Sequence, residues 1–404
     1  MRFIPAAMTP ISLVDVGRAA AEQFRGEPLR SLEETIAQYV GVRGAYSYTS
    51  FMRAIYACLT IIAENSPTDK NQVLLSRYSC PSFAHAIHAA GLEPAYCEMI
   101  PKTLSIDLDQ LERQDFSKVL AVIGVNFFGL SNPADRLSKL CKERGVYYVE
   151  GLDYSLGTEY QGKKVGTFGD FGILNFQEGK AIPVSGGMIV TNHTDLMKAH
   201  ARGQRKQRSS NVTMMCGYSV VTKPLPYYFF MKTSEFVGTN IRKRLSMEDT
   251  IRKTKDEFDF TFDDKQPLEQ ISNFQAKLAC TIMDRYESHI AIRRSNAEFL
   301  RKNLSACSGI ELIDPEPGIS NIHYVRFPIL VNANMRALLV SSLCKNGIEA
   351  STMYSDHGLN FEPSKFPGAA RVMDEIVTLP CHPGVEQRDL DKTVAIIKSL
   401  TMKQ

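Results

Sequence analysis

The sequence predicts an α/β protein, with a large domain built on a mostly parallel sheet covered by helices and a smaller C-terminal α/β domain. From about residue 45 to 192, short apolar strand patterns alternate with helical patterns, an order typical of parallel sheets. The stretch 119–128 is almost continuously apolar, as expected for a strand buried on both faces. A chain of 404 residues is long enough for a large domain and a companion.

Local patterns predict the elements of the large domain in order. Apolar residues at helical spacing predict a helix that starts at Phe51, and a second predicted helix, 83–90, ends at Gly91. A third helix is predicted after Pro133 and ends at Gly145. Strands are predicted over 73–75, 94–97, 119–128, 146–149, 171–176 and 188–191.

A basic segment interrupts this alternation. Residues 198–245 contain ten Lys or Arg against a single acid, Glu235, and enclose the apolar run 227–231. We expect an insert at about 198–265 that is solvated, with one aromatic anchor in the core or at a dimer contact. The alternative is a surface that meets an anionic membrane or a lipid-linked substrate.

A long helix predicted over 274–300 joins the two domains. The large domain is therefore expected to span 1–270, and the linking helix and small domain 271–404. In the small domain we expect a strand over 324–331, a helix over 335–345 and a final helix over 387–400.

Composition narrows the function classes. A net charge of +3 is too small to indicate a nucleic-acid partner. The nine cysteines are scattered without a CxxC pair, so the sequence predicts no zinc or other metal site and no disulfide framework, which fits a reducing compartment. The N-terminus lacks the apolar core of a secretory signal, and no stretch reaches the roughly 20 apolar residues that cross a bilayer. We expect a cytoplasmic protein.

Lys180 is the strongest candidate for covalent chemistry, because it stands just beyond the predicted strand 171–176. Burial disfavours a charged ammonium, and a neutral amine can form a Schiff base with an aldehyde such as pyridoxal 5'-phosphate (PLP). PLP also needs backbone N–H groups for its phosphate and a carboxylate for its pyridine nitrogen. Residues 47–50, which all bear hydroxyls and precede the helix at Phe51, are candidates for the phosphate, and Asp153 for the pyridine nitrogen.

Further motifs occur in a fixed order along the chain: Gly91-Leu92-Glu93-Pro94-Ala95-Tyr96, Ser105-Ile106-Asp107, 162–172, 186–192 and Leu379-Pro380-Cys381-His382-Pro383-Gly384. With Lys180 they resemble the DegT/StrS family of PLP-dependent sugar aminotransferases over about residues 26–400. The resemblance implies the aspartate-aminotransferase-type fold (fold type I) with a seven-stranded sheet, PLP bound to Lys180, and a homodimer. It also implies a nucleotide-linked keto sugar as substrate and an amino-acid donor.

The chain departs from the family pattern around the cofactor ring. The family's aspartate at the pyridine nitrogen corresponds to Gly151, and its Gln or His near the ring corresponds to Tyr154. Its ring-stacking aromatic residue falls on Cys80. We predict that Asp153 takes over from the missing carboxylate.

Departures also fall on the phosphate end. The family's Ser-Gly-Thr turn is Ser50-Phe51-Met52, its serine five residues before the lysine is Asn175, and the asparagine from the partner subunit is Ser219. Asn175 and Ser219 can still hydrogen-bond a phosphate. The resulting prediction is a PLP-dependent enzyme with a rearranged cofactor shell; the alternative is a non-catalytic relative that keeps the fold and the dimer.

The substrate candidates come from the small domain. His323 and Tyr324 begin a predicted strand that lies near the substrate in the family, although packing residues are an equal alternative. Tyr354 and His357, in a loop that follows Gly347, have the same two interpretations.

Overall fold

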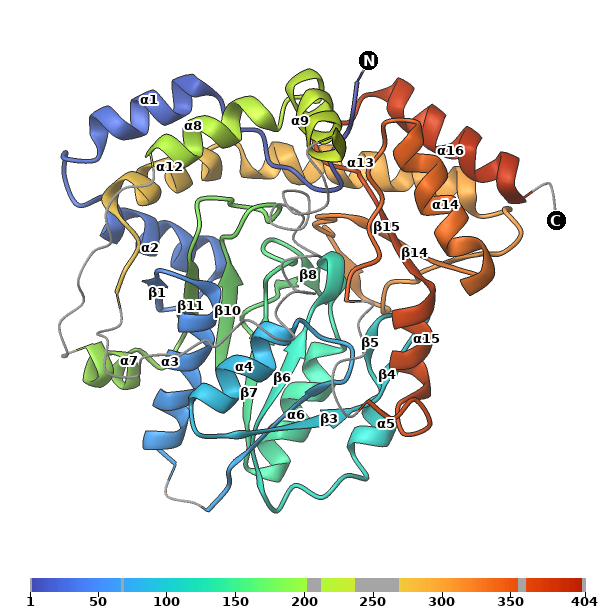
Figure 1. Cartoon of the computed structure of the whole chain (residues 1–404). Coiled ribbons are helices and arrows are strands. Elements are labelled where there is room, and N and C mark those ends of the chain that lie inside the picture. Colours follow the sequence, from blue (N-terminus) through green and yellow to red (C-terminus); the bar gives the residue numbers. More distant parts are fainter. Residues whose placement is uncertain (1, 67–68, 202–211, 237–268, 355–360, 402–404) are drawn as a thin grey trace.

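A seven-stranded sheet forms the centre of the molecule (Figure 1). The computed structural model describes residues 2–66, 69–201, 212–236, 269–354 and 361–401. In order across the sheet, the strands are β1 (Gly44–Tyr48), β11 (Gly187–Thr191), β10 (Phe171–Asn175), β7 (Tyr147–Gly151), β6 (Val119–Val125), β2 (Gln72–Ser76) and β3 (Glu93–Cys97). Four of the six strand pairs in this sheet are parallel and the two that involve β11 are antiparallel, so the predicted, mostly parallel sheet is confirmed.

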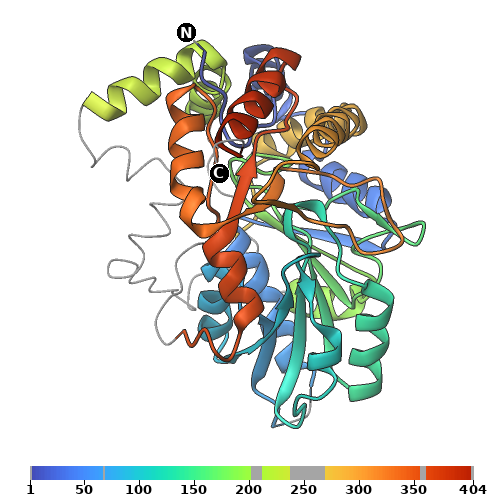
Figure 2. The ribbon, with the colours of Figure 1, turned by 90° about the vertical axis from the view of Figure 1, so that its right-hand side faces the viewer.

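Helices cover both faces of the sheet (Figure 2). Leu75 and Ile123 point into one core, which they share with α3 (Phe51–Glu64) and α4 (Pro81–Ala89). Their neighbours Leu74 and Val122 point to the opposite face and pack with α6 (Ala134–Arg144). This alternation explains why the strands read as continuous apolar runs. On that opposite face, α2 (Pro28–Val40) packs over the β11 end of the sheet.

The small domain is built on a three-stranded antiparallel sheet. Its strands, in order, are β12 (Ile310–Leu312), β14 (Phe327–Val331) and β15 (Ile376–Leu379). The helices of this part are α14 (Ala333–Lys345), α15 (Pro367–Glu375) and α16 (Gln387–Thr401). The N-terminal segment packs against this small domain. Ile4 N donates to Gly347 O at 2.8 Å, and Ile4 forms an isolated parallel β-bridge with Ile348. The division at 270 and 271 stays a prediction.

Shorter elements complete the described chain. They are α1 (Leu13–Glu22), β4 (Met99–Ile100), β5 (Ser105–Ile106), α5 (Leu108–Leu111), the 3₁₀ turn η1 (Phe127–Gly129), β8 (Glu159–Tyr160), β9 (Lys163–Lys164), α7 (Thr194–Ala201) and β13 (Ile319–Ser320).

Three predicted boundaries were wrong. The strand predicted over 119–128 ends at Val125, because the side chains of Asn126 and Asn132 bond to each other and turn the chain. The helix predicted over 274–300 is two helices, α12 (Asn273–Met283) and α13 (Tyr286–Leu304), separated where Arg285 pairs with Asp15.

The strand predicted from Tyr324 starts only at Phe327. The carbonyl oxygens of Tyr324 and Val325 accept hydrogen bonds from the buried Arg293 guanidinium. These two carbonyl oxygens therefore bond to a side chain, whereas a strand at this point would need them to bond to the backbone of a neighbouring strand.

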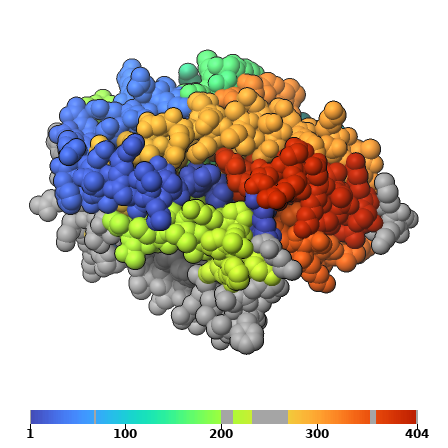
Figure 3. All heavy atoms as spheres, turned by 90° about the horizontal axis from the view of Figure 1, so that it is seen from above, coloured from blue at the N-terminus to red at the C-terminus, as the bar shows by residue number. Residues whose placement is uncertain are grey.

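The described part of the basic insert packs on the body of the same chain. It contains α8 (Val212–Val221) and α9 (Pro224–Phe236), which Figure 3 shows on one face of the molecule, where α8 packs beside α1. Tyr227 packs edge-on against Phe3 and its hydroxyl donates to Glu349 Oε2 at 2.8 Å, so it is an aromatic anchor. Residues 202–211 and 237–265 lie outside the described residues. Within the described chain, none of the helices is long and apolar enough to cross a membrane.

Candidate active site

Lys180 lies beyond the carboxyl end of β10, where a parallel sheet normally positions ligands. A tight turn follows the strand: Gly179 has φ 79°, and Lys180 N donates to Gln177 O at 3.1 Å. The carbonyl of Lys180 accepts a hydrogen bond from Thr9 Oγ1 at 3.0 Å. The side chain is buried, with 3% of the residue exposed. The turn therefore points an amine into the protein interior.

Asp153 is the partner of this amine. The distance from Lys180 Nζ to Asp153 Oδ2 is 3.0 Å, and both side chains are buried. Asp153 Oδ1 is buried and has no hydrogen-bond partner among the described residues. Because β7 ends at Gly151, Asp153 lies in the following turn and not on a continuing strand.

The two groups of the pair influence each other's protonation. Burial opposes the charged form of Lys180, but Asp153 and Tyr154 outweigh it and raise the pKa of the amine. Burial raises the pKa of Asp153, and the Lys180 ammonium only partly offsets this. Lys180 is therefore protonated at neutral pH, and Asp153 binds a proton more readily than an ordinary aspartate.

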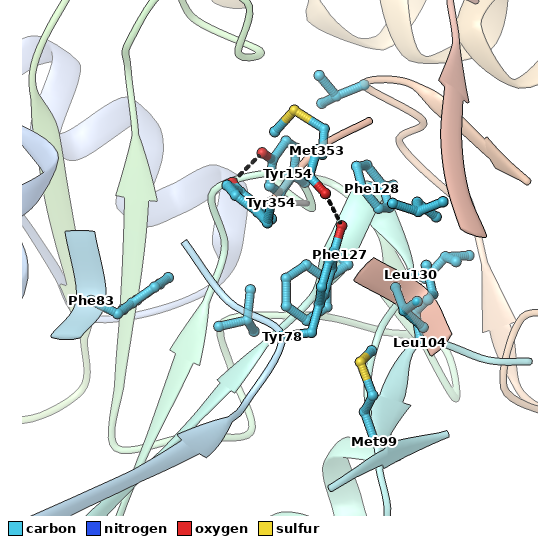
Figure 4. Close-up of a cluster of buried hydrophobic side chains, with 14 of the residues drawn as sticks. Tyr78, Phe83, Met99, Leu104, Phe127, Phe128, Leu130, Tyr154, Met353 and Tyr354 are labelled. Carbon is cyan, nitrogen blue, oxygen red and sulfur yellow. Dashed lines mark hydrogen bonds between the residues drawn. The ribbon is translucent and has the colours of Figure 1, made fainter. Parts of the chain in front are cut away.

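A cluster of aromatic side chains reaches the pair through Tyr154, and Figure 4 shows Tyr154 with Tyr354, Tyr78, Phe127 and Phe128. The Tyr154 ring lies over Lys180 Nζ, with 3.3 Å between the nitrogen and the ring centroid, a cation–π arrangement. The hydroxyls of Tyr154 and Tyr354 are hydrogen-bonded at 2.7 Å. Tyr78 donates to the Met353 carbonyl at 3.0 Å and its ring contacts Tyr354. Residues 353 and 354 therefore pack against Tyr78 and against Tyr154, the ring that covers the lysine amine.

Three of these aromatic residues were missed by the sequence interpretation. Tyr78 follows β2, and Phe127 and Phe128 follow β6, so all three lie at the carboxyl edge of the sheet. Tyr78 contacts Phe127 at 5.0 Å between ring centroids, and Phe128 contacts Tyr154 at 5.4 Å. An aromatic residue directly after a buried parallel strand is the signal that could have identified them.

The predicted phosphate end lies at the start of α3. Ser50 is the N-cap residue, and its Oγ accepts the Arg53 N–H at 3.2 Å. Phe51 is buried and packs edge-on against Phe83, whereas Met52 is half-buried. The first turn of the helix offers N–H groups that favour an anion.

Cys80, at the start of α4, is half-buried and interacts electrostatically with Lys180 and Tyr354. Asp153, Tyr154, Tyr354 and Cys80 thus gather around the amine. Gly151 lies farther back on β7, and a Cβ there would be 3.0 Å from the Cα of Val125. A side chain at 151 would therefore require the neighbouring strand to shift.

Three other predicted site residues form hydrogen bonds away from the lysine amine. Asn175 Oδ1 accepts the Gln177 N–H at 2.9 Å, and Ser219 Oγ donates to Cys216 O at 2.9 Å within α8. His323 Nδ1 is hydrogen-bonded to the Tyr286 hydroxyl at 3.0 Å in the core. Tyr324 is buried and lines a cavity of about 350 Å³. His357 lies outside the described residues. The roles of these residues stay predictions.

The donor set fits PLP in its main parts. A buried amine can bind its aldehyde carbon, and the start of α3 with Ser50 can bind its phosphate. Asp153 is the buried counter-charge of that amine, and its Oδ1 has no hydrogen-bond partner among the described residues.

Comparisons with known proteins identify the family of this chain. The model of the DegT/DnrJ/EryC1/StrS aminotransferase family matches residues 15–222 and 268–398. The putative pyridoxal phosphate-dependent aminotransferase EpsN of Bacillus subtilis is 33% identical over 41% of this chain and 44% of its own length. This chain is thus aligned to less than half of that relative.

Two further comparisons cover more of the chain. The GDP-4-keto-6-deoxy-D-mannose 3-dehydratase of Yersinia pseudotuberculosis is 23% identical over 84% of this chain and 81% of its own. The aminotransferase PseC of Helicobacter pylori, involved in pseudoaminic acid biosynthesis, superposes with a TM-score of 0.76 over 100% of both chains at 18% identity, which shows a shared fold. The family match spans most of the sequence, and the protein belongs to the DegT/DnrJ/EryC1/StrS aminotransferase family.

Proposed function

We propose that this protein is a PLP-dependent aminotransferase that transfers an amino group from an amino-acid donor to a nucleotide-linked keto sugar. The observation that carries the proposal is the buried Lys180 amine, held by Asp153 at the carboxyl edge of the sheet. Family membership and relatives named for amino transfer and for a nucleotide-linked keto sugar support it.

A task in the reaction is proposed for Lys180, Ser50, Tyr154 and Tyr354. When bound, PLP would supply an electron sink for the carbon that loses a proton. Lys180 would bind the cofactor and move that proton. Ser50 and the first turn of α3 would bind the phosphate. Tyr154 and Tyr354 would keep water away from the lysine.

We also propose the setting of the reaction. The protein would act as a homodimer in the cytoplasm, where its nine free thiols remain reduced. The aminated sugar would then enter polysaccharide biosynthesis.

Cofactor attachment is the first test. Purified protein saturated with PLP should show a visible absorption band, and borohydride reduction should fix the label on Lys180, as mapped by peptide mass spectrometry. Lys180→Ala should lose band and label, whereas Lys164→Ala should keep both. Absence of the band, or a label on another lysine, would overturn the proposal and favour the non-catalytic alternative.

A second candidate reaction is removal of water from the same class of sugar. The specific observation is the relative named a 3-dehydratase, which matches 84% of this chain. Incubation with a nucleotide-linked keto sugar and ¹⁵N-glutamate distinguishes the two, because transamination adds ¹⁵N to the sugar and dehydration removes one water from it.

A further inference from the structure

The position of Asp153 relative to Lys180 differs from the one its predicted role requires. A carboxylate that serves the pyridine nitrogen must lie at the end of the ring opposite the carbon that the lysine binds, because the two positions are para to each other. Asp153 Oδ2 instead contacts the lysine nitrogen itself at 3.0 Å. In this arrangement the carboxylate serves the amine end of the site.

We propose that Asp153 is the counter-ion and proton acceptor of Lys180, so that this carboxylate acts on the lysine nitrogen. This inference deepens the proposed function and rests on it for the purpose of the proton transfer. The ion pair itself needs no cofactor. Gly151, at the family's usual carboxylate position, leaves the pyridine end without an acid from that strand.

The transfer is balanced within the pair. One N–H bond of the Lys180 ammonium breaks and one O–H bond forms on Asp153, and the lysine keeps the lone pair that makes it a nucleophile. The proton moves along the 3.0 Å hydrogen bond from Lys180 Nζ to Asp153 Oδ2. No described residue donates a hydrogen bond to Oδ1, so none holds that oxygen in its charged form. Burial destabilises the charged pair of ammonium and carboxylate but not the neutral pair of amine and carboxylic acid. The free-energy difference between the charged and the neutral pair is therefore smaller in this site than in water.

Within the described part of the chain, three other titratable groups lie near the amine. Tyr154 covers it with its ring, Tyr354 bonds to the Tyr154 hydroxyl, and Cys80 lies within electrostatic reach. The pKa of each tyrosine is raised, with burial as the main cause, so both stay neutral at ordinary pH. Asp153 is therefore the group that determines the charge of Lys180.

The test titrates Lys180 directly. In full-length, cofactor-free protein labelled with ¹⁵N at lysine Nζ, the Lys180 resonance is assigned with Lys180→Arg and followed against pH. Asp153→Asn removes the counter-charge with little change of shape and leaves burial unopposed. The neutral fraction of the amine should then rise at least about tenfold at a given pH. Asp195→Asn removes a carboxylate that is 98% exposed and should leave the titration unchanged.

An unchanged Lys180 titration in Asp153→Asn would overturn the proposal. If that variant does not fold, Lys180→Met examines the same pair from the other side. Without the ammonium, the Asp153 carboxyl, followed by ¹³C resonance, should protonate at higher pH, and an unshifted carboxyl would also overturn the proposal. A protein that fails to bind PLP would contradict the proposed function but leave these titrations interpretable.

Discussion

At the scale of single residues, His382 shows how burial selects one protonation state. Its Nε2–H donates to the Pro5 carbonyl at 2.8 Å, and its Nδ1 accepts the Gly384 N–H at 3.1 Å. The neutral ring therefore satisfies both nitrogens. Burial, together with the nearby Arg293, lowers the pKa of His382 to about 3.

This low pKa predicts an acid-dependent loss of stability. Below the ordinary histidine pKa of about 6.5, His382 is protonated in the unfolded chain. In the folded chain it stays neutral until about pH 3. The free energy of unfolding should therefore decrease as the pH decreases. His382 contributes up to about 1.4 kcal/mol of this loss per pH unit. In urea unfolding between about pH 7 and pH 4, His382→Asn should show a shallower decline. Exposed His88→Asn should match the wild type, and equal slopes for His382→Asn would contradict the prediction.

At the scale of elements, Glu98 attaches a helix of the small domain to the large one. Its buried carboxylate accepts the N–H groups of Gly368 and Ala369 in the first turn of α15, each at 2.9 Å, and the N–H of Met99 at 2.8 Å. These N–H groups at a helix start have no partner within the helix, and the negative charge favours that end.

Neutralising this carboxylate should loosen the attachment. Glu98→Gln replaces one acceptor oxygen with an NH₂ group that faces N–H donors, so we expect a loss of about 1–3 kcal/mol in the free energy of unfolding. The measurement is urea unfolding followed by circular dichroism. Glu93→Gln, at an exposed position on β3, should change stability by less than about 0.5 kcal/mol. A loss no larger in Glu98→Gln would show that α15 docks by apolar packing alone.

At the scale of the whole molecule, Arg293 on α13 ties together parts of the chain that are distant in sequence. Its guanidinium donates to Met8 O at 2.7 Å and Thr9 Oγ1 at 3.0 Å, and to Val325 O at 3.0 Å. Thr9 in turn donates to the Lys180 carbonyl. The arginine is fully buried, so each of these bonds replaces water that cannot reach it.

A lysine cannot reproduce this planar fork of donors. Arg293→Lys should therefore lower the free energy of unfolding by about 3 kcal/mol, measured by urea unfolding. The adjacent Arg294, which bonds to Asn321 at the rim of a cavity, provides the matched control. Arg294→Lys should cost less than about 1 kcal/mol. Similar losses in both variants would mean that the buried fork does not join the segments.

The sequence by itself determined the features that depend on local pattern. Alternating apolar segments identified the parallel sheet, and apolar residues at helical spacing identified the start of α3 at Phe51. The position of Lys180 after a buried strand followed from the same kind of signal. These predictions succeeded because strand burial, helix caps and turns depend on residues close together in the chain.

Only the tertiary structure decided which distant side chains meet. It brought Tyr354 of the small domain to Tyr154, joined Ile4 to Ile348, and separated α12 from α13 where Arg285 pairs with Asp15. It also ended β7 at Gly151, so that the turn directs Asp153 to the lysine amine. A strand pattern specifies the face of a residue only while the strand lasts, and contacts between distant segments arise from packing that no local pattern records.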